Sequence, residues 1–255
     1  MHSAIHPVVS FSKVDFMIDG RSLLRNITLS AYPGETIVLL GRSGAGKTTL
    51  LMLANRMLEP TRGQVMVEGV PTLQWDAITL RRRIGYVIQE VGLFPHITIE
   101  RNIAVVPELE NWPRTRIQNR VAELLQIVGM KSEVASRYPR QLSGGQRQRA
   151  GVARALAADP PVLLMDEPFG ALDPLTRAEM QRELAAMQQR LQKTILFVTH
   201  DLREALVLAS RIVLMDEGEI VLTATPEEFQ LSKHPLAVAY LSAFQTGGAA
   251  PGTTA

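Results

Sequence analysis

The sequence predicts an α/β fold in which helices cover a mostly parallel sheet. Short apolar runs at residues 36–40, 86–88, 162–165 and 195–198 lie far apart along the chain, with helix-like segments between several of them. Parallel strands need such long connections, and strands buried on both faces are apolar throughout. Because the N-terminal stretch is β-like and the middle section is helical, we also expect an antiparallel β-subdomain and an inserted helical subdomain.

Composition excludes several classes of partner and chemistry. Lys plus Arg number 27 against 25 Asp plus Glu, a formal charge of +2, so no broad basic field exists for nucleic acid. The lack of cysteine excludes disulfides, thiolate catalysis and Cys-ligated zinc. Residues 1–7 lack the start of a secretion signal, and no apolar run approaches the roughly 18 residues that span a bilayer. We therefore expect a chain that stays in the cytosol, crosses no membrane by itself and binds no nucleic acid.

Two stretches near the ends of the chain read as β-structure. Turn signals at 19–20 and 32–34 divide residues 8–40 into short β-type runs, the last of which is the strand 36–40. Near the C-terminus, the apolar runs 212–215 and 219–222 flank a turn that contains Asp-Glu-Gly. These patterns predict an antiparallel sheet at the start and a hairpin near the end.

The middle of the chain has helical periodicity. The residues that fall on one helix face are Ile117, Val121, Leu124, Leu125 and Val128. Gly129 follows and can close that helix with a left-handed cap. We expect one domain over residues 8–245, with a core of 8–89 and 160–245 and a helical subdomain of about 90–159. The tail 246–255, rich in Gly, Ala, Thr and Pro, has nothing to bury and is expected to be disordered.

A glycine-rich loop follows the strand 36–40 and precedes a helix that extends to Met57. It fits the pattern GxxxxGK[ST] and consists of Gly41, Arg42, Ser43, Gly44, Ala45, Gly46, Lys47 and Thr48, followed by Thr49. Backbone N–H groups and the helix N-terminus would hold the phosphates of ATP. Lys47 would reach the β and γ phosphates, and the Thr48 hydroxyl would ligate Mg²⁺. The alternative is a glycine-rich turn that carries an unrelated lysine.

Two carboxylates follow the apolar strand 162–165. Asp166 and Glu167 stand where the carboxyl edge of a parallel sheet opens onto a ligand crevice. Asp166 is suited to hold Mg²⁺ through its water shell, and Glu167 to orient or deprotonate the water that attacks the γ phosphate. An isolated pair of this kind more often caps a strand, but its coupling to a phosphate loop favours the catalytic interpretation.

His200 ends the buried-type strand that begins at Ile195, at the same predicted sheet edge as Glu167. Asp201 and Glu204 supply an N-cap and an N3 residue for the helix that follows. This position favours a contact between His200 and the γ phosphate over the structural role usual for a lone histidine. The other histidines have no such context and keep the structural interpretation: His2, His6, His96 and His234.

A second glycine-containing helix start lies at Ser143, Gly144, Gly145 and Gln146. Ser143 and Gln146 match a capping box before the helix-competent run 147–156. Such an N-terminus can bind a second anion, or it can be no more than a capped helix start.

Residues 142–146 read LSGGQ, and their place between the phosphate loop and the acidic strand resembles the ATPases of ABC transporters. The resemblance covers about residues 8–244 and implies a P-loop NTPase core. Gln89 stands where the family has a glutamine that contacts metal and lytic water and senses the membrane subunits. Asp173 belongs to the D-loop of the resemblance, and His200 stands at its switch histidine.

The same resemblance implies a head-to-tail homodimer. ATP on the phosphate loop of one copy would be covered by Ser143, Gly144 and Gly145 of the other, with Gln146 and Asp173 also near the nucleotide. ATP would close the dimer, and hydrolysis would release it. Such a subunit works with integral membrane permease subunits and an extracytoplasmic solute-binding protein, as a peripheral protein on the cytoplasmic face of the inner membrane.

An aromatic residue near the N-terminus usually stacks on adenine in this family. The expected place falls near Ile18, which is not aromatic, and Phe16 or Phe11 can substitute. We assign Phe16. The alternative is that Phe16 belongs to the core of its strand.

Residues 85–103 and 138–177 are similar to the ATPases of bacterial glycine betaine, carnitine and choline importers. The expected cargo is therefore a quaternary amine. Phe94, Pro95 and Ile97 are candidates for the groove that receives a helix of the membrane subunit, unless they pack within the helical subdomain.

Other functions fit the sequence less well. A phospholipid or amino-acid ABC system stays open as an alternative cargo. Soluble ABC proteins that act on DNA or ribosomes carry a long inserted coiled coil or two cassettes in one chain, and this sequence has neither. A metabolic kinase with the same phosphate loop would leave LSGGQ and His200 unexplained.

Overall fold

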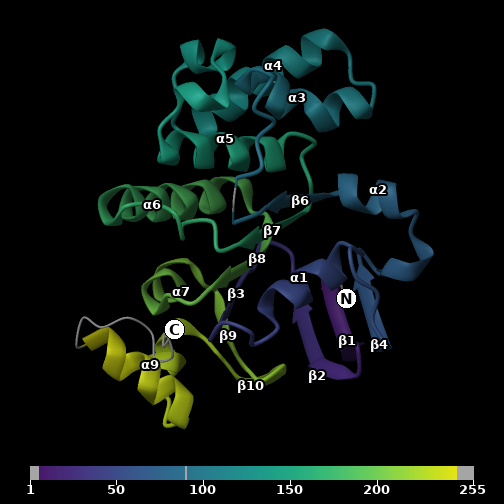
Figure 1. Cartoon of the computed structure of the whole chain (residues 1–255), viewed down its shortest axis with the longest axis vertical. Helices are drawn as coiled ribbons and strands as arrows, with labels where there is room; N and C mark the ends of the chain where they lie inside the picture. The colour runs from purple at the N-terminus through teal and green to yellow at the C-terminus, as the bar shows by residue number, and fades with distance from the viewer. Residues whose placement is uncertain (1–5, 90, 246–255) are drawn as a thin grey trace, which may run out of the picture. The chain divides into compact units, whose positions relative to one another are not determined.

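The computed structural model describes residues 6–89 and 91–245, which form two compact units (Figure 1). The first unit contains the described residues up to Arg81 and those from Gln192 onward, and the second is Arg82–Leu191. The boundaries between the compact units, near residues 82 and 191, thus differ from the predicted subdomain boundaries at about 90 and 160. The predicted disordered tail 246–255 lies outside the described residues.

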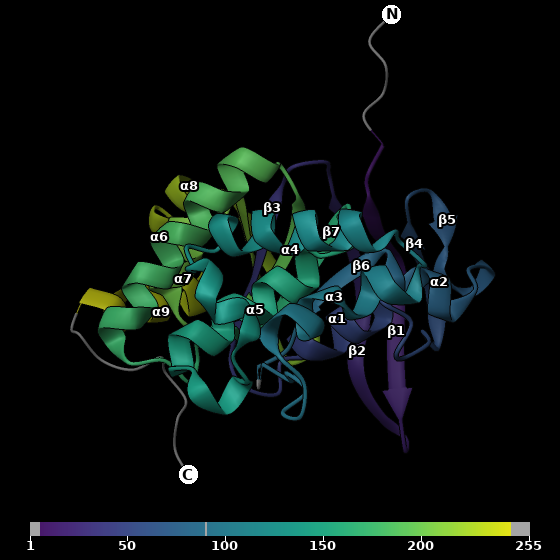
Figure 2. The same cartoon turned by 90° about the horizontal axis from the view of Figure 1, so that it is seen from above.

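The first unit holds the predicted antiparallel sheet, with strand order β2-β1-β4-β5. Its strands are β1 Val9–Ile18, β2 Arg21–Ala31, β4 Arg62–Val67 and β5 Val70–Pro71. β1 pairs antiparallel with both β2 and β4, and Figure 2 shows β1 and β2 side by side. Phe11, Val14 and Phe16 of β1 are buried, because apolar side chains of this strand turn toward the core.

A second sheet in the same unit contains the strand that leads into the phosphate loop. The strands that belong to this unit have the order β10-β9-β3-β8, with β3 Thr36–Gly41, β8 Thr194–Thr199, β9 Arg211–Asp216 and β10 Glu219–Ala224. β3 is parallel to both β8 and β9, and every residue of β3 and β8 is buried. β9 and β10 form the predicted hairpin, whose turn residues Glu217 and Gly218 have φ of 44° and 82°.

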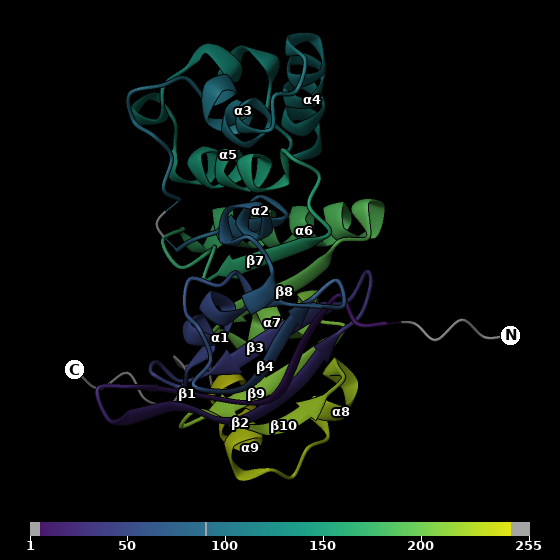
Figure 3. The same cartoon turned by 90° about the vertical axis from the view of Figure 1, so that its right-hand side faces the viewer.

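Helices cover the sheets of the first unit. They are α1 Lys47–Ala54, the 3₁₀ turn η1 Thr72–Gln74, α7 Leu202–Leu208, α8 Pro226–Gln230 and α9 Pro235–Gln245, with α2 Ala77–Arg82 at the boundary. α1 packs on β3 and β8, and α7 packs on β3 and α9. α8 packs on β9 and β10, and α9 packs on α8, as Figure 3 shows.

The second unit joins two parallel strands to a group of helices. β6 Ile84–Val87 pairs with β7 Val162–Asp166, and all residues of β7 are buried. The helices are α3 Ile99–Leu109, α4 Arg114–Ile127, η2 Ser132–Ser136, η3 Pro139–Gln141, α5 Gly144–Leu156 and α6 Pro174–Leu191.

Within this second unit, α5 packs on α3, α4, α6 and β6, and Figure 1 shows it between the teal helices α3 and α4 and the green helix α6. The predicted helix around Val121 is confirmed as α4, and Gly129 beyond it has the expected left-handed φ of 65°. Over residues 6–89 and 91–245, every helix is too short or too polar to cross a bilayer.

Candidate active site

The loop at residues 41–48 has a backbone that only glycine allows at key positions. Gly44 and Gly46 have φ of 81° and 91°, in the left-handed region. A Cβ on Gly46 would lie 2.5 Å from Cδ2 of Leu24, and a Cβ on Gly41 would overlap the carbonyl oxygen of Met215. The glycines of the pattern are therefore required by the local packing and conformation.

Lys47 begins α1, directly after this loop. Its side chain is buried at 5% exposure, and Nζ donates hydrogen bonds of 2.8 Å to the carbonyl oxygens of Gly41 and Arg42. The ammonium group therefore lies against its own loop. Gly46 at the N-cap has no side chain to occupy the helix N-terminus, where Thr48 and Thr49 form the first turn.

His200 lies in the same unit as the loop, at the same sheet edge. Leu40 of β3 pairs with Thr199 of β8, so Gly41 and His200 follow directly paired residues of neighbouring parallel strands. The His200 side chain is exposed. The strand register therefore brings the loop and the histidine to one edge of the sheet. The predicted common edge of His200 and Glu167 stays a prediction.

Polar groups fix the chain around His200. Asp201 accepts a hydrogen bond from the backbone N–H of Arg203, which confirms it as the N-cap of α7. The Thr199 hydroxyl donates a 2.6 Å bond to the buried carboxylate of Glu204. Glu204, predicted to complete a capping box, is thus engaged with the residue before the histidine.

Gln89 and Glu167 lie at the same strand end in the second unit. Val87 of β6 pairs with Met165 of β7, so the two residues lie equally far beyond paired positions of parallel strands. Nε2 of Gln89 and Oε2 of Glu167 each lie 3.9 Å from the point where a Cβ on Gly170 would stand. Glu167 also has a φ of 44°, in the left-handed region that few residues other than glycine adopt.

Asp166 ends β7 as a buried carboxylate. The hydroxyl of Tyr86, on the neighbouring strand, donates a hydrogen bond to it, and burial together with the charge of Asp166 raises the pKa of Tyr86 to about 12. Tyr86 therefore stays neutral and remains a donor to the carboxylate. The sequence alone did not single out this tyrosine.

The predicted magnesium ligands are oxygen donors: the Thr48 hydroxyl, the Gln89 amide and the Asp166 carboxylate. Mg²⁺ prefers oxygen and, next to phosphates, takes only one or two protein carboxylates while keeping several waters. No group of three or more His, Asp or Glu side chains able to hold a metal occurs within the described part of the chain. The donor set fits Mg²⁺, which would supply positive charge at the terminal phosphates.

The LSGGQ segment forms the predicted capped helix start. Ser143 accepts from the N–H of Gln146 at 3.2 Å, and Gln146 accepts from the N–H of Ser143 at 3.1 Å, a complete capping box. Ser143 and Gly144 are exposed. A Cβ on Gly145 would lie 2.6 Å from Cγ2 of Thr176, so the helix start packs closely on the start of α6.

Asp173 caps α6. Its Oδ1 accepts hydrogen bonds from the N–H groups of Leu175 at 3.2 Å and Thr176 at 3.0 Å, and bonds from Thr176 are the main reason that its pKa is lowered. The predicted contact of Asp173 with nucleotide stays a prediction.

The assignment of Phe16 to adenine stacking does not agree with its burial. Phe16 is 7% exposed and pairs with Leu24 on β2, and Phe11 is 2% exposed. Rings enclosed in this way offer no free face to a base, so the alternative of a core strand residue is favoured. Ile18, at the position expected from the family, is 47% exposed.

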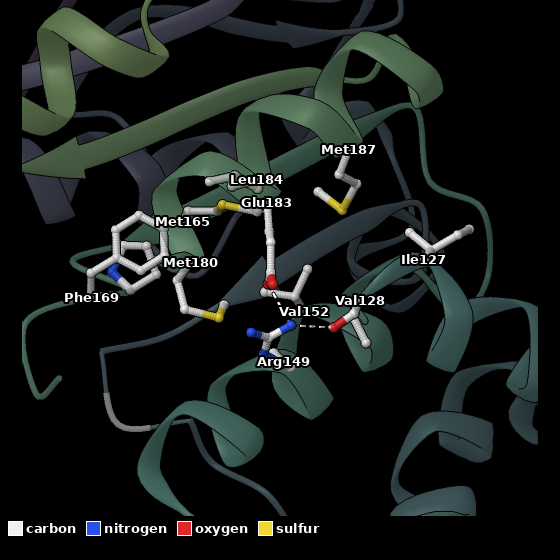
Figure 4. A pocket seen from close by; sticks show the side chains of 11 residues that line it. Ile127, Val128, Arg149, Val152, Met165, Phe169, Met180, Glu183, Leu184 and Met187 are labelled. Carbon is white, nitrogen blue, oxygen red and sulfur yellow. Dashed lines mark hydrogen bonds and ion pairs between the residues drawn. The ribbon is translucent and has the colours of Figure 1, made fainter. Parts of the chain in front are cut away.

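A small cavity in the second unit is lined by residues on either side of Asp166 and Glu167, and it is too small for a nucleotide (Figure 4). Its volume is about 20 Å³, near the space of one water, and its lining includes Met165, Met180 and Met187. At its edge Arg149 of α5 forms an ion pair with Glu183 of α6 and donates to the Val128 carbonyl at 3.0 Å. These contacts join α4, α5 and α6.

Comparison with known proteins identifies relatives over most of the chain. A family model described as ABC transporter matches residues 24–170. The glycine betaine/carnitine/choline transport ATP-binding protein OpuCA of Bacillus subtilis is 52% identical over 209 residues, 82% of this chain and 55% of that protein. The glycine betaine uptake system ATP-binding protein YehX of Escherichia coli is 48% identical over 219 residues, 86% of this chain and 71% of that protein. The chain spans about half the length of OpuCA.

Solved structures confirm the predicted fold class. The structure of cbiO1 from Clostridium perfringens, part of the ABC transporter complex cbiONQ, has a TM-score of 0.83 at 27% identity and covers 95% of this chain and 98% of its own. A dimeric ATP-binding cassette bound to ADP and Pi has a TM-score of 0.76 at 30% identity, with coverage of 86% and 98%.

Proposed function

This chain belongs to the ABC transporter ATP-binding family, and from that premise we propose that it hydrolyses MgATP to drive solute import. The observation that carries the proposal is the strand register. It brings the phosphate loop and His200 to one sheet edge in the first unit, and Gln89 and Glu167 to one edge in the second. These are the positions where open α/β sheets bind their ligands.

The proposed roles follow from the chemistry of each side chain. Residues 41–49, which include Lys47, bind the phosphates. Thr48, Asp166 and Gln89 would hold Mg²⁺, and Glu167 orients or deprotonates the attacking water. His200 contacts the γ phosphate.

Hydrolysis is proposed to occur in a homodimer. The exposed Ser143 and Gly144, at the N-terminus of α5, supply a second anion-binding surface for nucleotide held by the other copy. The dimeric relative bound to ADP and Pi supports this arrangement. Binding of two nucleotides between two copies would make dimer formation depend on ATP.

The proposed cargo is a quaternary amine, such as glycine betaine, carnitine or choline. The support is that several relatives of about 50% sequence identity, including OpuCA and YehX, are named as transport proteins for these solutes. The proposed partners are permease subunits and an extracytoplasmic solute-binding protein, and the proposed location is the cytoplasmic face of the membrane. A screen of solutes for stimulation of ATP turnover in the complex with the permease tests the cargo, and stimulation by phospholipid or amino acids alone would overturn it.

The loop that follows Gln89 is the proposed docking site for the permease. Phe94 is 44% exposed, and Pro95 and His96 are exposed beside it. Buried Asn102 fixes this loop, because it accepts from the N–H of Phe94 at 2.7 Å and donates to the carbonyls of Phe94, Ile97 and Thr98. An apolar side chain on a rigid loop suits a helix-in-groove contact.

Substitution of Glu167 by Gln tests the proposed hydrolysis. We expect Glu167→Gln to keep ATP binding, to lower kcat at least about a hundredfold because the general base is lost, and to accumulate a nucleotide-bound dimer. Phosphate release and size-exclusion chromatography with ATP measure both effects. Undiminished turnover would remove Glu167 from the mechanism, and a wild-type chain without ATPase activity would overturn the function itself.

A further inference from the structure

Arg154, near the end of α5, is hydrogen-bonded to the backbone of Val91 and Gly92, shortly after Gln89. Its Nη1 donates a 2.6 Å hydrogen bond to the carbonyl of Gly92, and its Nη2 donates a 2.9 Å bond to the carbonyl of Val91. Burial lowers the pKa of this guanidinium from its usual value. Two parallel N–H donors on adjacent carbonyls form a forked contact that lysine cannot reproduce.

Gly151, one helical turn earlier, receives the same segment. A Cβ on Gly151 would lie 2.5 Å from Cγ1 of Val91, so any larger residue would push Val91 away from the helix. Residues 91 and 92 are therefore held against α5 from two directions, by packing at Gly151 and by hydrogen bonds at Arg154.

The position of this contact gives it a functional meaning. The gripped segment lies between Gln89 and the Asn102-fixed loop that carries exposed Phe94. The helix that grips it begins at the Ser143 capping box. A short, packed and hydrogen-bonded path therefore connects this loop to α5 within one compact unit.

We propose that Arg154 is a positioning residue that makes the segment after Gln89 and the Ser143 end of α5 move together. The proposal rests on the proposed function. In it, a partner that shifts the loop at Phe94 also shifts the helix N-terminus that covers nucleotide on the other copy. Arg154 contacts no reacting group, and it acts by fixing where Gln89 and Ser143 lie relative to each other.

The chain offers a matched control in Arg120. This arginine of α4 also donates to two backbone carbonyls of α5 and its end, Leu156 at 2.9 Å and Ala157 at 3.2 Å, but it does not reach the segment after Gln89. Arg154→Met and Arg120→Met each leave two carbonyls without their guanidinium donor. Arg120 also pairs with Glu123 at 2.9 Å and with Asp159 at 3.4 Å, so Arg120→Met should lose at least as much stability as Arg154→Met.

The test compares these variants as purified full-length chains. We expect Arg154→Met to lower kcat for ATP about tenfold or more with little change in KM, because misplaced groups slow the reaction while the phosphate loop still binds. In a Glu167→Gln background, Arg154→Met should fail to form the ATP-dependent dimer. Arg120→Met should keep kcat within about twofold and should still dimerise. Arg154→Lys should give an intermediate kcat, because charge without the fork restores only part of the contact.

Two outcomes overturn the proposal. One is equal kcat and dimer formation in Arg154→Met and Arg120→Met. The other concerns Gly151→Ala, which is used if Arg154→Met does not fold. This variant displaces Val91 but leaves Arg154 in place, so a wild-type kcat in Gly151→Ala would reject the coupling. Because wild-type turnover and its loss in Glu167→Gln are measured alongside, a failure of the coupling is distinguished from a failure of the ATPase function.

Discussion

At Gly46 the conformation of one residue and its packing act together. Gly44 and Gly46 share a left-handed backbone, yet a Cβ on Gly44 meets nothing within 4 Å, whereas one on Gly46 would meet Leu24 and the carbonyl of Leu23. The two glycines of one loop therefore separate the cost of an unfavourable φ from the cost of a steric clash.

We expect Gly44→Ala to lower the free energy of unfolding by about 1–2 kcal/mol through its φ alone. Gly46→Ala should cost about 1–3 kcal/mol more through overpacking against Leu24. Urea denaturation of both variants measures the difference. Equal losses would show that Leu24 moves aside and that the loop is not confined there.

At the scale of elements, α5 begins at a capping box that is also proposed to face nucleotide. Thr225 and Glu228 form the same capping box at the start of α8, with bonds of 3.2 and 2.8 Å. The two helices thus share one cap chemistry, and only the cap of α5 is proposed to face nucleotide.

We expect Ser143→Ala and Thr225→Ala each to lower the free energy of unfolding by about 1 kcal/mol, because each helix loses a side-chain cap. Only Ser143→Ala should weaken ATP-dependent dimer formation in the Glu167→Gln background. Chemical denaturation and chromatography with ATP provide the two measurements. A dimer as stable in Ser143→Ala as in Thr225→Ala would argue against nucleotide contact at this helix start.

At the scale of the whole molecule, each compact unit has one tyrosine whose pKa is raised, the half-buried Tyr86 and the buried Tyr240. Burial is the main cause that raises the pKa of Tyr86 in the second unit and of Tyr240 in the first from 10.0 to about 12. Between these values the unfolded chain has lost the phenol proton and the folded chain keeps it. Stability contributed by the neutral phenols is therefore full below pH 10 and falls as the pH rises toward 12.

We expect the free energy of unfolding to fall between about pH 10 and 12, and Tyr86→Phe and Tyr240→Phe each to flatten that fall. Tyr138→Phe, at a side chain that is 39% exposed, is the control for removal of a phenol hydroxyl. Denaturant titrations over this pH range measure the effect. An identical slope in all three variants would contradict the assignment.

Much of the fold and most of the candidate site follow from local patterns. Fully apolar runs identified β3, β7 and β8, and turn residues identified the β9–β10 hairpin. The phosphate loop and the Ser143 capping box depend on residues within a few positions of one another, so their spacing is visible in the sequence. Gln89, Glu167 and His200 could be found because each ends or follows a buried strand.

The sequence by itself determined that this chain carries a phosphate loop, an acidic strand end and a capped LSGGQ helix, because each depends on near neighbours. Only the tertiary structure decided that Phe16 is buried, that Tyr86 donates to Asp166 and that Arg154 holds Val91 and Gly92. Those contacts join residues on different elements, and their formation depends on how strands register and helices pack. No local pattern contains that information, since the free energy of such contacts is gained only when distant segments meet.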